Sequence, residues 1–420
     1  MFRAILNAFR IKEIRNRIFY TLAILALYRF GATLTIPGVD ANAVMSQVQG
    51  GMLGMLDLFS GGALGRFAVF SLGIMPYITS SIIMQLLQVV IPKLEQLAKE
   101  GEVGRRKITQ ISRYLTVGLA LIQSVAMVFY FRNFGAIPKF DFIHVFMIIV
   151  TLAAGTTLIM WLGELINLHG IGNGISLIIF ASIVSRMPGQ IISLFRLKTI
   201  NIIYLIAIAA IAVGIIMAII MMTQGERKIP VQYAKRIVGR KVFGGQSTYI
   251  PLKVNQAGVM PIIFAVSILL FPATIAQFTS VKWLQTIANM LTPRESGGIN
   301  PVYAVVYTIL IIGFAYFYGA ITFNPNDTAD NLRRYGGFIP GLRPGKNTAD
   351  YLSNILNRIT LPGAFFLAMV ALLPEVLIAY GGIPFRFGGT SLLIAVSVAL
   401  ETMRQLESQL IMRDYEGFLK

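Results

Sequence analysis

Long apolar runs alternate with short polar or glycine- and proline-rich segments along most of the chain. About 20 apolar residues in a helix cross the hydrocarbon core of a bilayer. Ten runs approach that length, and they occupy residues 18–36, 67–90, 114–131, 142–162, 175–187, 202–222, 257–276, 302–323, 359–379 and 390–410. The fifth run is short because Pro188 follows it, and the tenth carries Glu401 and Arg404. The pattern predicts an all-α polytopic membrane protein with ten transmembrane helices.

Composition and charge agree with that pattern. Of the 420 residues, 56% are hydrophobic and 13% are charged. Soluble domains carry about 25% charged residues, so this chain cannot cover a soluble surface, and it is too apolar for disorder. The 36 Lys and Arg residues outnumber the 18 Asp and Glu residues, giving a net charge of +18. Positive charge accumulates in short cytoplasmic loops. If both termini lie in the cytoplasm, most of the basic residues lie in cytoplasmic segments. We therefore expect that orientation.

Runs two and seven share a short motif. Residues 73–76 read GIMP and residues 258–261 read GVMP, each in the second span of a five-span half. An odd number of spans per half inserts the halves in opposite orientations, as in inverted-repeat transport proteins. We therefore expect two inverted five-helix halves, residues 1–190 and 191–420, with a pathway at their interface. Proline loosens a spanning helix, so runs two and seven are expected to move.

The segment before run two is unusual. Residues 53–66 read LGMLDLFSGGALGR, which is too short to cross the membrane and too apolar for a solvated loop. Asp57 and Arg66 flank a pliable Ser-Gly-Gly centre. Irregular backbone at membrane depth is tolerated only when protein buries it or when it lines a water-filled cavity. Two interpretations stay open, namely a packed interfacial helix and a mobile re-entrant segment that stoppers a pathway.

Two cytoplasmic loops are long and patterned. Residues 224–256 alternate basic residues with Val, Ile, Phe and Tyr around a central Gly-Gly, which predicts a two-stranded projection. Residues 324–358 contain RRYGGFIPGLRPG, in which Gly and Pro predict a fixed, non-helical turn that exposes Arg343. Judged by charge alone, both loops could serve only to orient the protein in the membrane. Their aromatic, Gly and Pro content favours docking surfaces for a large partner with acidic grooves or phosphates.

Three function classes compete: a passive polypeptide channel gated by partners, an inverted-repeat secondary transporter for a small solute, and an intramembrane enzyme. The chain has no Cys and two His residues, which disfavours enzymes and metal sites. Ion-coupled transporters keep an Asp, Glu or His near mid-membrane, whereas the acids here lie mainly in loops or span ends, with Glu401 the chief exception. Arg29, inside run one, is expected to pair with a buried acceptor or to reach the outer interface.

Several long strings resemble one family. They are FSGGALGR with LGIMPYITSSIIMQLL, the GIGNGIS of residues 170–176, the loop IPVQYAKRIVGRKVFGGQSTYIPLKVNQAGVMP, the turn GFIPGLRPG, and the FGGTSLLI of residues 387–394. From the first predicted span to about Glu416, the chain resembles the bacterial SecY family, the channel subunits of the protein-conducting translocon. Such long, ordered strings make the resemblance highly specific.

The resemblance implies roles for named residues. An aliphatic ring that seals the pore would consist of Ile78, Ile82, Ile175, Ile179, Ile263 and Ile394. A plug over residues 53–66 would include Met55, Leu56, Leu58, Phe59, Ser60, Gly61, Gly62, Ala63 and Leu64. A lateral gate, formed by spans two and three against seven and eight, would include Pro76, Gln85, Pro261 and Ser267. Docking of SecA and the ribosome would use Arg227, Lys228, Arg240, Lys241 and Arg343.

The resemblance also implies a function and partners. Unfolded polypeptides would cross the cell inner membrane through the chain, and transmembrane segments would leave through the lateral gate into lipid. Expected partners are SecE, SecG, the SecA ATPase, the ribosome, preproteins with signal sequences and the lipid bilayer, with no sequence-specific nucleic acid, cofactor or metal. No GxxxxGK[ST] string occurs in the chain, so ATP hydrolysis is assigned to a partner and the chain is expected not to be an enzyme.

Overall fold

The computed structural model describes residues 8–48, 51–196, 202–233, 236–238, 241–243, 247–276, 281–292, 300–381 and 389–418. The first half contains α2 (Lys12–Gly31), α3 (Ala41–Val48), α4 (Gly51–Phe59), α5 (Met75–Val90), α6 (Pro92–Lys99), α7 (Glu102–Arg132), α8 (Phe142–His169) and α9 (Gly174–Arg196). The second half contains α10 (Ile202–Gln224), β1 (Glu226–Tyr233), β2 (Arg236–Val238), β3 (Lys241–Phe243), β4 (Ser247–Lys253), α11 (Met260–Ala276), α12 (Lys282–Met290), α13 (Pro301–Thr322), α14 (Pro325–Arg334), β5 (Gly337–Phe338), α15 (Lys346–Gly381) and α16 (Gly389–Phe418).

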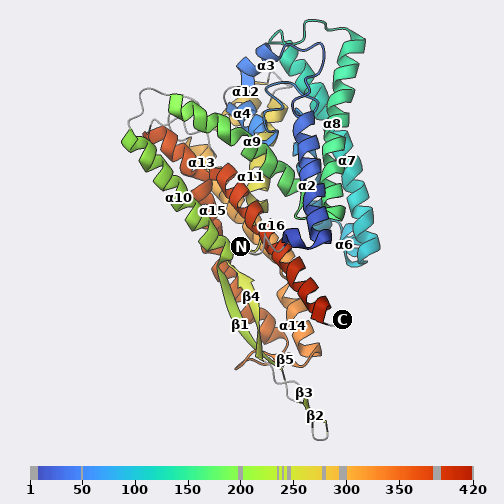
Figure 1. Cartoon of the computed structure of the whole chain (residues 1–420), viewed down its shortest axis with the longest axis vertical. Coiled ribbons are helices and arrows are strands. Elements are labelled where there is room, and N and C mark those ends of the chain that lie inside the picture. The colour runs from blue at the N-terminus through green and yellow to red at the C-terminus, as the bar shows by residue number, and fades with distance from the viewer. Residues whose placement is uncertain are drawn as a thin grey trace.

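The long helices form a bundle from which the β-strands project at one end, with α3 and α12 at the opposite end (Figure 1). In the first half, α7 packs against α5 and α8, and α2 packs against α8 and α9. In the second half, α13 packs against α11 and α15, and α16 packs against α10 and α15. The halves meet where α5 contacts α11 and where α9 contacts α16. A large apolar core containing side chains of both halves lies at this junction.

Each of the ten predicted runs overlaps one long helix, and these helices are α2, α5, α7, α8, α9, α10, α11, α13, α15 and α16. Among the described residues, four helical segments are long and apolar enough to cross a membrane by themselves. A fifth is added if α5 and α6, which bend by 100° at their junction, count as one span. The protein is therefore mostly helical with several membrane-spanning candidates, and the count of ten stays a prediction.

The GxMP motif begins a helix at both of its positions. Gly73 and Gly258 have φ angles of 57° and 62°, a left-handed conformation that glycine adopts without strain. Pro76 and Pro261 are the second residues of α5 and α11, where a backbone N–H has no intrahelical acceptor to lose. The prediction that these prolines loosen the interior of spanning helices is wrong. Residues 67–74 of run two accordingly form turns rather than helix.

Pro188 does not end the fifth helix as its position predicts, because α9 continues through it to Arg196. Proline inside a helix removes one hydrogen bond, which tertiary packing can offset. Here α9 packs against α4, α8 and α16. The expected boundary between the halves at residues 190 and 191 therefore falls inside this helix.

The two patterned loops fold together as one projection. β1 pairs antiparallel with β4 from Glu226↔Lys253 to Gln232↔Ser247, which confirms the predicted two-stranded element. β5, from the second loop, adds to the other edge of β1 and gives the strand order β4-β1-β5. The inward faces of β1 and β4 bury Ile229, Val231 and Leu252 against α14 and α15. This small core fixes the second loop relative to the first.

Candidate functional site

The six isoleucines come together in the core between the halves. Ile78 and Ile82 lie on α5, Ile175 and Ile179 on α9, Ile263 on α11 and Ile394 on α16. Five of them are 4% exposed or less, and Ile175 is partly buried against the same core. Two of these helices belong to each half, so separating the halves would divide the cluster. An aliphatic constriction gives water and ions no hydrogen-bond partner and favours dewetting.

Residues 53–66 fold as the end of α4 and a tight turn. Phe59, Ser60, Ala63 and Leu64 are buried, and Leu56, Leu58 and Gly62 are partly buried. The side chain of Met55 lies outside the described residues. Gly61 and Gly62 have φ angles of 69° and 87°, so the turn needs glycine at both positions. The segment is thus packed inside protein, which is the burial that irregular backbone would need at membrane depth.

Asp57 holds the turn together from the inside. Its backbone carbonyl accepts hydrogen bonds from the Gly62 N–H at 2.9 Å and the Ser60 hydroxyl at 3.1 Å. Its Oδ1 accepts the Gly65 N–H at 2.8 Å. The Ser60 hydroxyl in turn accepts the Leu64 N–H at 3.2 Å. The Asp57 side chain is only 3% exposed. The hydrogen bond from the Gly65 N–H to its carboxylate therefore replaces a hydrogen bond to water that is lost on burial.

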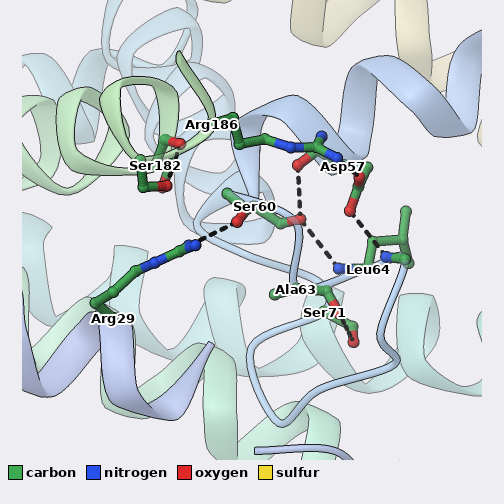
Figure 2. A network of polar contacts seen from close by, with 11 residues as sticks. Arg29, Asp57, Ser60, Ala63, Leu64, Ser71, Ser182 and Arg186 are labelled. Carbon is green, nitrogen blue, oxygen red and sulfur yellow. Dashed lines mark hydrogen bonds and ion pairs between the residues drawn. The ribbon is translucent and has the colours of Figure 1, made fainter. Parts of the chain in front are cut away.

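Cationic side chains from two neighbouring helices contact this turn (Figure 2). The Arg186 guanidinium on α9 lies 2.7 Å from Oδ2 of Asp57. The Arg29 guanidinium on α2 donates to the Gly61 carbonyl at 2.7 Å, which confirms the prediction of a buried acceptor for Arg29. Tyr28 adds an uncharged link, since its hydroxyl lies 2.6 Å from the Ser182 hydroxyl and 3.3 Å from the Ser60 carbonyl.

A cavity of about 230 Å³ lies on the seam between α5, α7 and α11. Its lining is mainly apolar and includes Leu56 from residues 53–66 together with Leu270 and Phe271 from α11. The polar lining side chains are Ser71, Thr79, Gln123 and Ser267. An apolar cavity with a few polar groups suits a mainly apolar ligand.

The four predicted gate residues lie on both walls of this seam. Pro76 and Pro261 start α5 and α11, and Ser267 lines the cavity. Gln85 accepts a 2.6 Å hydrogen bond from the hydroxyl of Tyr318 on α13. The seam therefore carries at least one polar bond between helices of opposite halves.

The predicted docking residues that the structure describes lie on the projection. Arg227 and Lys228 are exposed on β1, and Lys241 begins β3. The Lys228 ammonium lies 4.8 Å from the centre of the Tyr249 ring. Arg240 lies outside the described residues.

Arg343 is exposed in the turn that follows β5. Its backbone carbonyl accepts a 3.0 Å hydrogen bond from the Thr348 hydroxyl, which fixes the turn without involving the guanidinium. Because β5 pairs with β1, the Arg343 turn and the basic β1–β4 hairpin are joined in one projection.

Sequence reasoning did not identify Arg186, Tyr28, Ser182 or Tyr318 as site residues. Arg186 had a usable signal, since a cation inside an apolar run needs a partner and Asp57 is an acid inside an apolar segment. Tyr28, Ser182 and Tyr318 carry no such signal, because Tyr and Ser are common in spanning helices. Among the described residues, no cluster of three or more His, Cys, Asp or Glu side chains has metal-site geometry.

Comparison with known proteins agrees with this architecture. The SecY family model matches residues 68–403. The protein translocase subunit SecY of Streptomyces galbus is 47% identical over 441 aligned residues that cover 100% of both chains. A solved structure concerned with the plug domain of the SecY protein, which stabilises the closed state of the translocation channel, has a TM-score of 0.66 at 20% identity and covers 94% of this chain and 92% of that one.

Canine Sec61 in a ribosome–channel complex from the endoplasmic reticulum has a TM-score of 0.62 at 19% identity, and covers 94% of this chain and 93% of its own. At such identities the structural likeness shows the fold, whereas the family follows from the sequence matches. The chain belongs to the SecY family of protein translocase subunits.

Proposed function

We propose that this protein-conducting channel subunit closes its pore with a seal of two parts, neither of which is tight to ions without the other. The first is the cluster of six isoleucines, and the second is the segment 53–66. The observation that carries the proposal is that the isoleucines of α5, α9, α11 and α16 gather in one core between the two halves. The packed turn beside that core supports the second part, in keeping with the plug described for a SecY protein of the same fold. A family of translocase subunits gives no support to a small-solute transporter.

The seam between α5, α7 and α11 is proposed as the lateral gate. Its mainly apolar cavity would accept an apolar signal sequence or transmembrane segment and pass it to lipid. The α5–α11 contact, with the Gln85–Tyr318 bond, is the place where the halves would part. Two five-helix halves, inverted relative to each other, and ten spans are part of the same proposal.

The basic projection is proposed as the docking site of the SecA ATPase and the ribosome. Exposed Arg227, Lys228 and Arg343 suit both partners, because guanidinium groups pair with carboxylates and phosphates alike. A Sec61 channel of the same fold has been solved with a ribosome. SecE and SecG are proposed companions in the cell inner membrane, with both termini cytoplasmic, and the chain itself is proposed to have no enzymatic activity.

Ion conductance tests the isoleucine barrier directly. Serine at Ile78, Ile82 and Ile263 would hydrate the constriction, so the purified translocase in planar bilayers should conduct ions at rest. Ile309 on α13 is 63% exposed and supplies the control, because Ile309→Ser changes the same side chain away from the core. Conductance of the triple variant equal to that of wild type would refute the seal.

A further inference from the structure

Among the described residues, the polar contacts between residues 53–66 and neighbouring helices come from α2 and α9 (Figure 2). A further bond, from the Ser71 hydroxyl to the Ala63 carbonyl at 3.1 Å, joins the segment to the turns that directly follow it in the first half. Arg29 and Tyr28 of α2 contact the carbonyls of Gly61 and Ser60, and Arg186 of α9 contacts Asp57. Both helices belong to the first half, and α2 packs directly on α9. The turn and its polar partners therefore form one unit on one side of the seam.

Residues 53–66 face the second half through apolar side chains. Leu56 lines the cavity together with Leu270 and Phe271 of α11. Contacts between apolar surfaces are non-directional. One such surface can therefore separate from its partner and be replaced by another apolar surface, such as a helix entering from lipid. Parting α5 from α11 would therefore leave the polar contacts to α2 and α9 in place.

Asp57 makes release of the turn from α2 and α9 a separate event from the parting of α5 and α11. Its side chain is 3% exposed and its charge is balanced by Arg186, whose side chain is 25% exposed. A buried carboxylate that loses its charged partner is strongly unfavourable unless it reaches water. The segment must therefore move far enough to hydrate Asp57, which favours two discrete positions over a gradual shift.

We propose that the Asp57–Arg186 ion pair and the Arg29–Gly61 hydrogen bond form a latch that keeps residues 53–66 on the first half when the halves part. The inference rests on the proposed plug role of this segment. It divides channel opening into two events. Parting of α5 and α11 admits apolar segments to lipid, and release of the latch is needed only when a polypeptide crosses the membrane.

The test compares three readouts of the purified translocase: resting ion conductance, translocation of a secretory preprotein, and insertion of a strongly apolar transmembrane segment. The variants are Asp57→Asn, Arg186→Gln and the exchange of both charges, Asp57→Arg with Arg186→Asp. Each single variant should raise resting conductance several-fold and speed preprotein translocation, while insertion stays at the wild-type rate. The exchange restores the ion pair but not the acceptor for the Gly65 N–H, so conductance should return only part of the way toward wild type.

A matched control exists in the same half. Arg113 on α7 and Glu164 on α8 form an ion pair of 2.7 Å between two helices, away from the turn. Glu164→Gln should leave resting conductance at the wild-type level. If a single latch variant does not yield folded complex, judged by size-exclusion chromatography and thermal unfolding, Arg186→Lys and Arg29→Lys take its place, since they keep the charge and lose the fork geometry.

Deletion of residues 55–64 separates the latch from the plug role on which it rests. If the deletion leaves conductance unchanged, the plug assignment fails. If the deletion raises conductance but single latch variants conduct like wild type, the plug stands and the latch is overturned. If the single latch variants change insertion of the transmembrane segment as strongly as they change ion conductance, the division of channel opening into two events is overturned.

Discussion

The hydroxyl of Tyr318 on α13 donates a 2.6 Å hydrogen bond to the side-chain oxygen of Gln85 on α5, and so joins helices of opposite halves. The Tyr318 ring also packs edge-on against Phe264 of α11 at 5.0 Å between ring centres. One side chain thus contacts both helices of the proposed gate. A hydrogen bond at this position favours the closed seam, because parting α5 from α13 must break it.

Tyr318→Phe should make the gate easier to open. The variant keeps the ring and its packing and loses one hydrogen bond, worth about 1 kcal/mol, or a shift of roughly fivefold in the closed-to-open equilibrium. Insertion of transmembrane segments of graded hydrophobicity into proteoliposomes measures the effect, and less apolar segments should become competent. Tyr316→Phe is the control, since its hydroxyl bonds the Asn357 carbonyl within the second half. An equal effect of both variants would contradict the gate role of the bond.

Arg343→Glu should uncouple the channel from its cytoplasmic partners without unfolding it. The guanidinium is exposed, and the turn is held through the Arg343 carbonyl, which any residue supplies. Charge reversal at a docking surface replaces attraction by repulsion and lowers the association rate. SecA binding and SecA-driven translocation report the loss, with Lys107→Glu on α7 as a charge-matched control outside the two loops. Unchanged translocation would remove Arg343 from the docking site.

Hydropathy predicted the positions of the long helices because burial in lipid imposes one simple requirement, continuous apolar length. The hairpin of β1 and β4 was predictable for a similar reason, since alternation marked its two faces. The third strand, Gly337–Phe338, is too short to give a pattern and forms only because the β1 edge is available to it. The start of α5 at Met75 was also hidden, because the preceding turns are as apolar as a helix.

Only part of the candidate site could be predicted from the sequence, because its contacts depend on how distant elements pack. Six isoleucines in apolar runs look like any core or lipid-facing residues, so the pore-ring role predicted for them came from family resemblance rather than from periodicity. The Asp57–Arg186 pair depends on how α4 meets α9, which no local pattern encodes. Tyr318 and Gln85 lie far apart in the sequence, and neither residue is unusual in its own helix.

Gly61→Ala should push the turn of residues 53–66 away from α9. A Cβ at this position would lie 3.0 Å from Cα of Ser182, and the φ angle of 69° disfavours alanine by about 1–2 kcal/mol. Resting ion conductance should rise, and the thermal stability of the purified complex should fall. Gly189→Ala on α9 is the control, because its Cβ would meet open space. A tight seal in Gly61→Ala would show that the turn does not need its close contact with Ser182.

A covalent bridge across the seam should block lateral opening. The chain has no Cys, so cysteines at Thr79 on α5 and Ser267 on α11, which line the same cavity, provide unique attachment points for a cleavable bis-maleimide. The bridged protein should fail to insert apolar transmembrane segments, and cleavage of the cross-linker should restore insertion. Cysteines at Thr79 and Leu119 form the matched control, since both line that cavity from the first half and their bridge leaves the halves free to part. If the bridge between α5 and α11 leaves insertion at the wild-type rate while the cross-link is complete by gel shift, apolar segments leave the channel elsewhere, and the seam is not the gate.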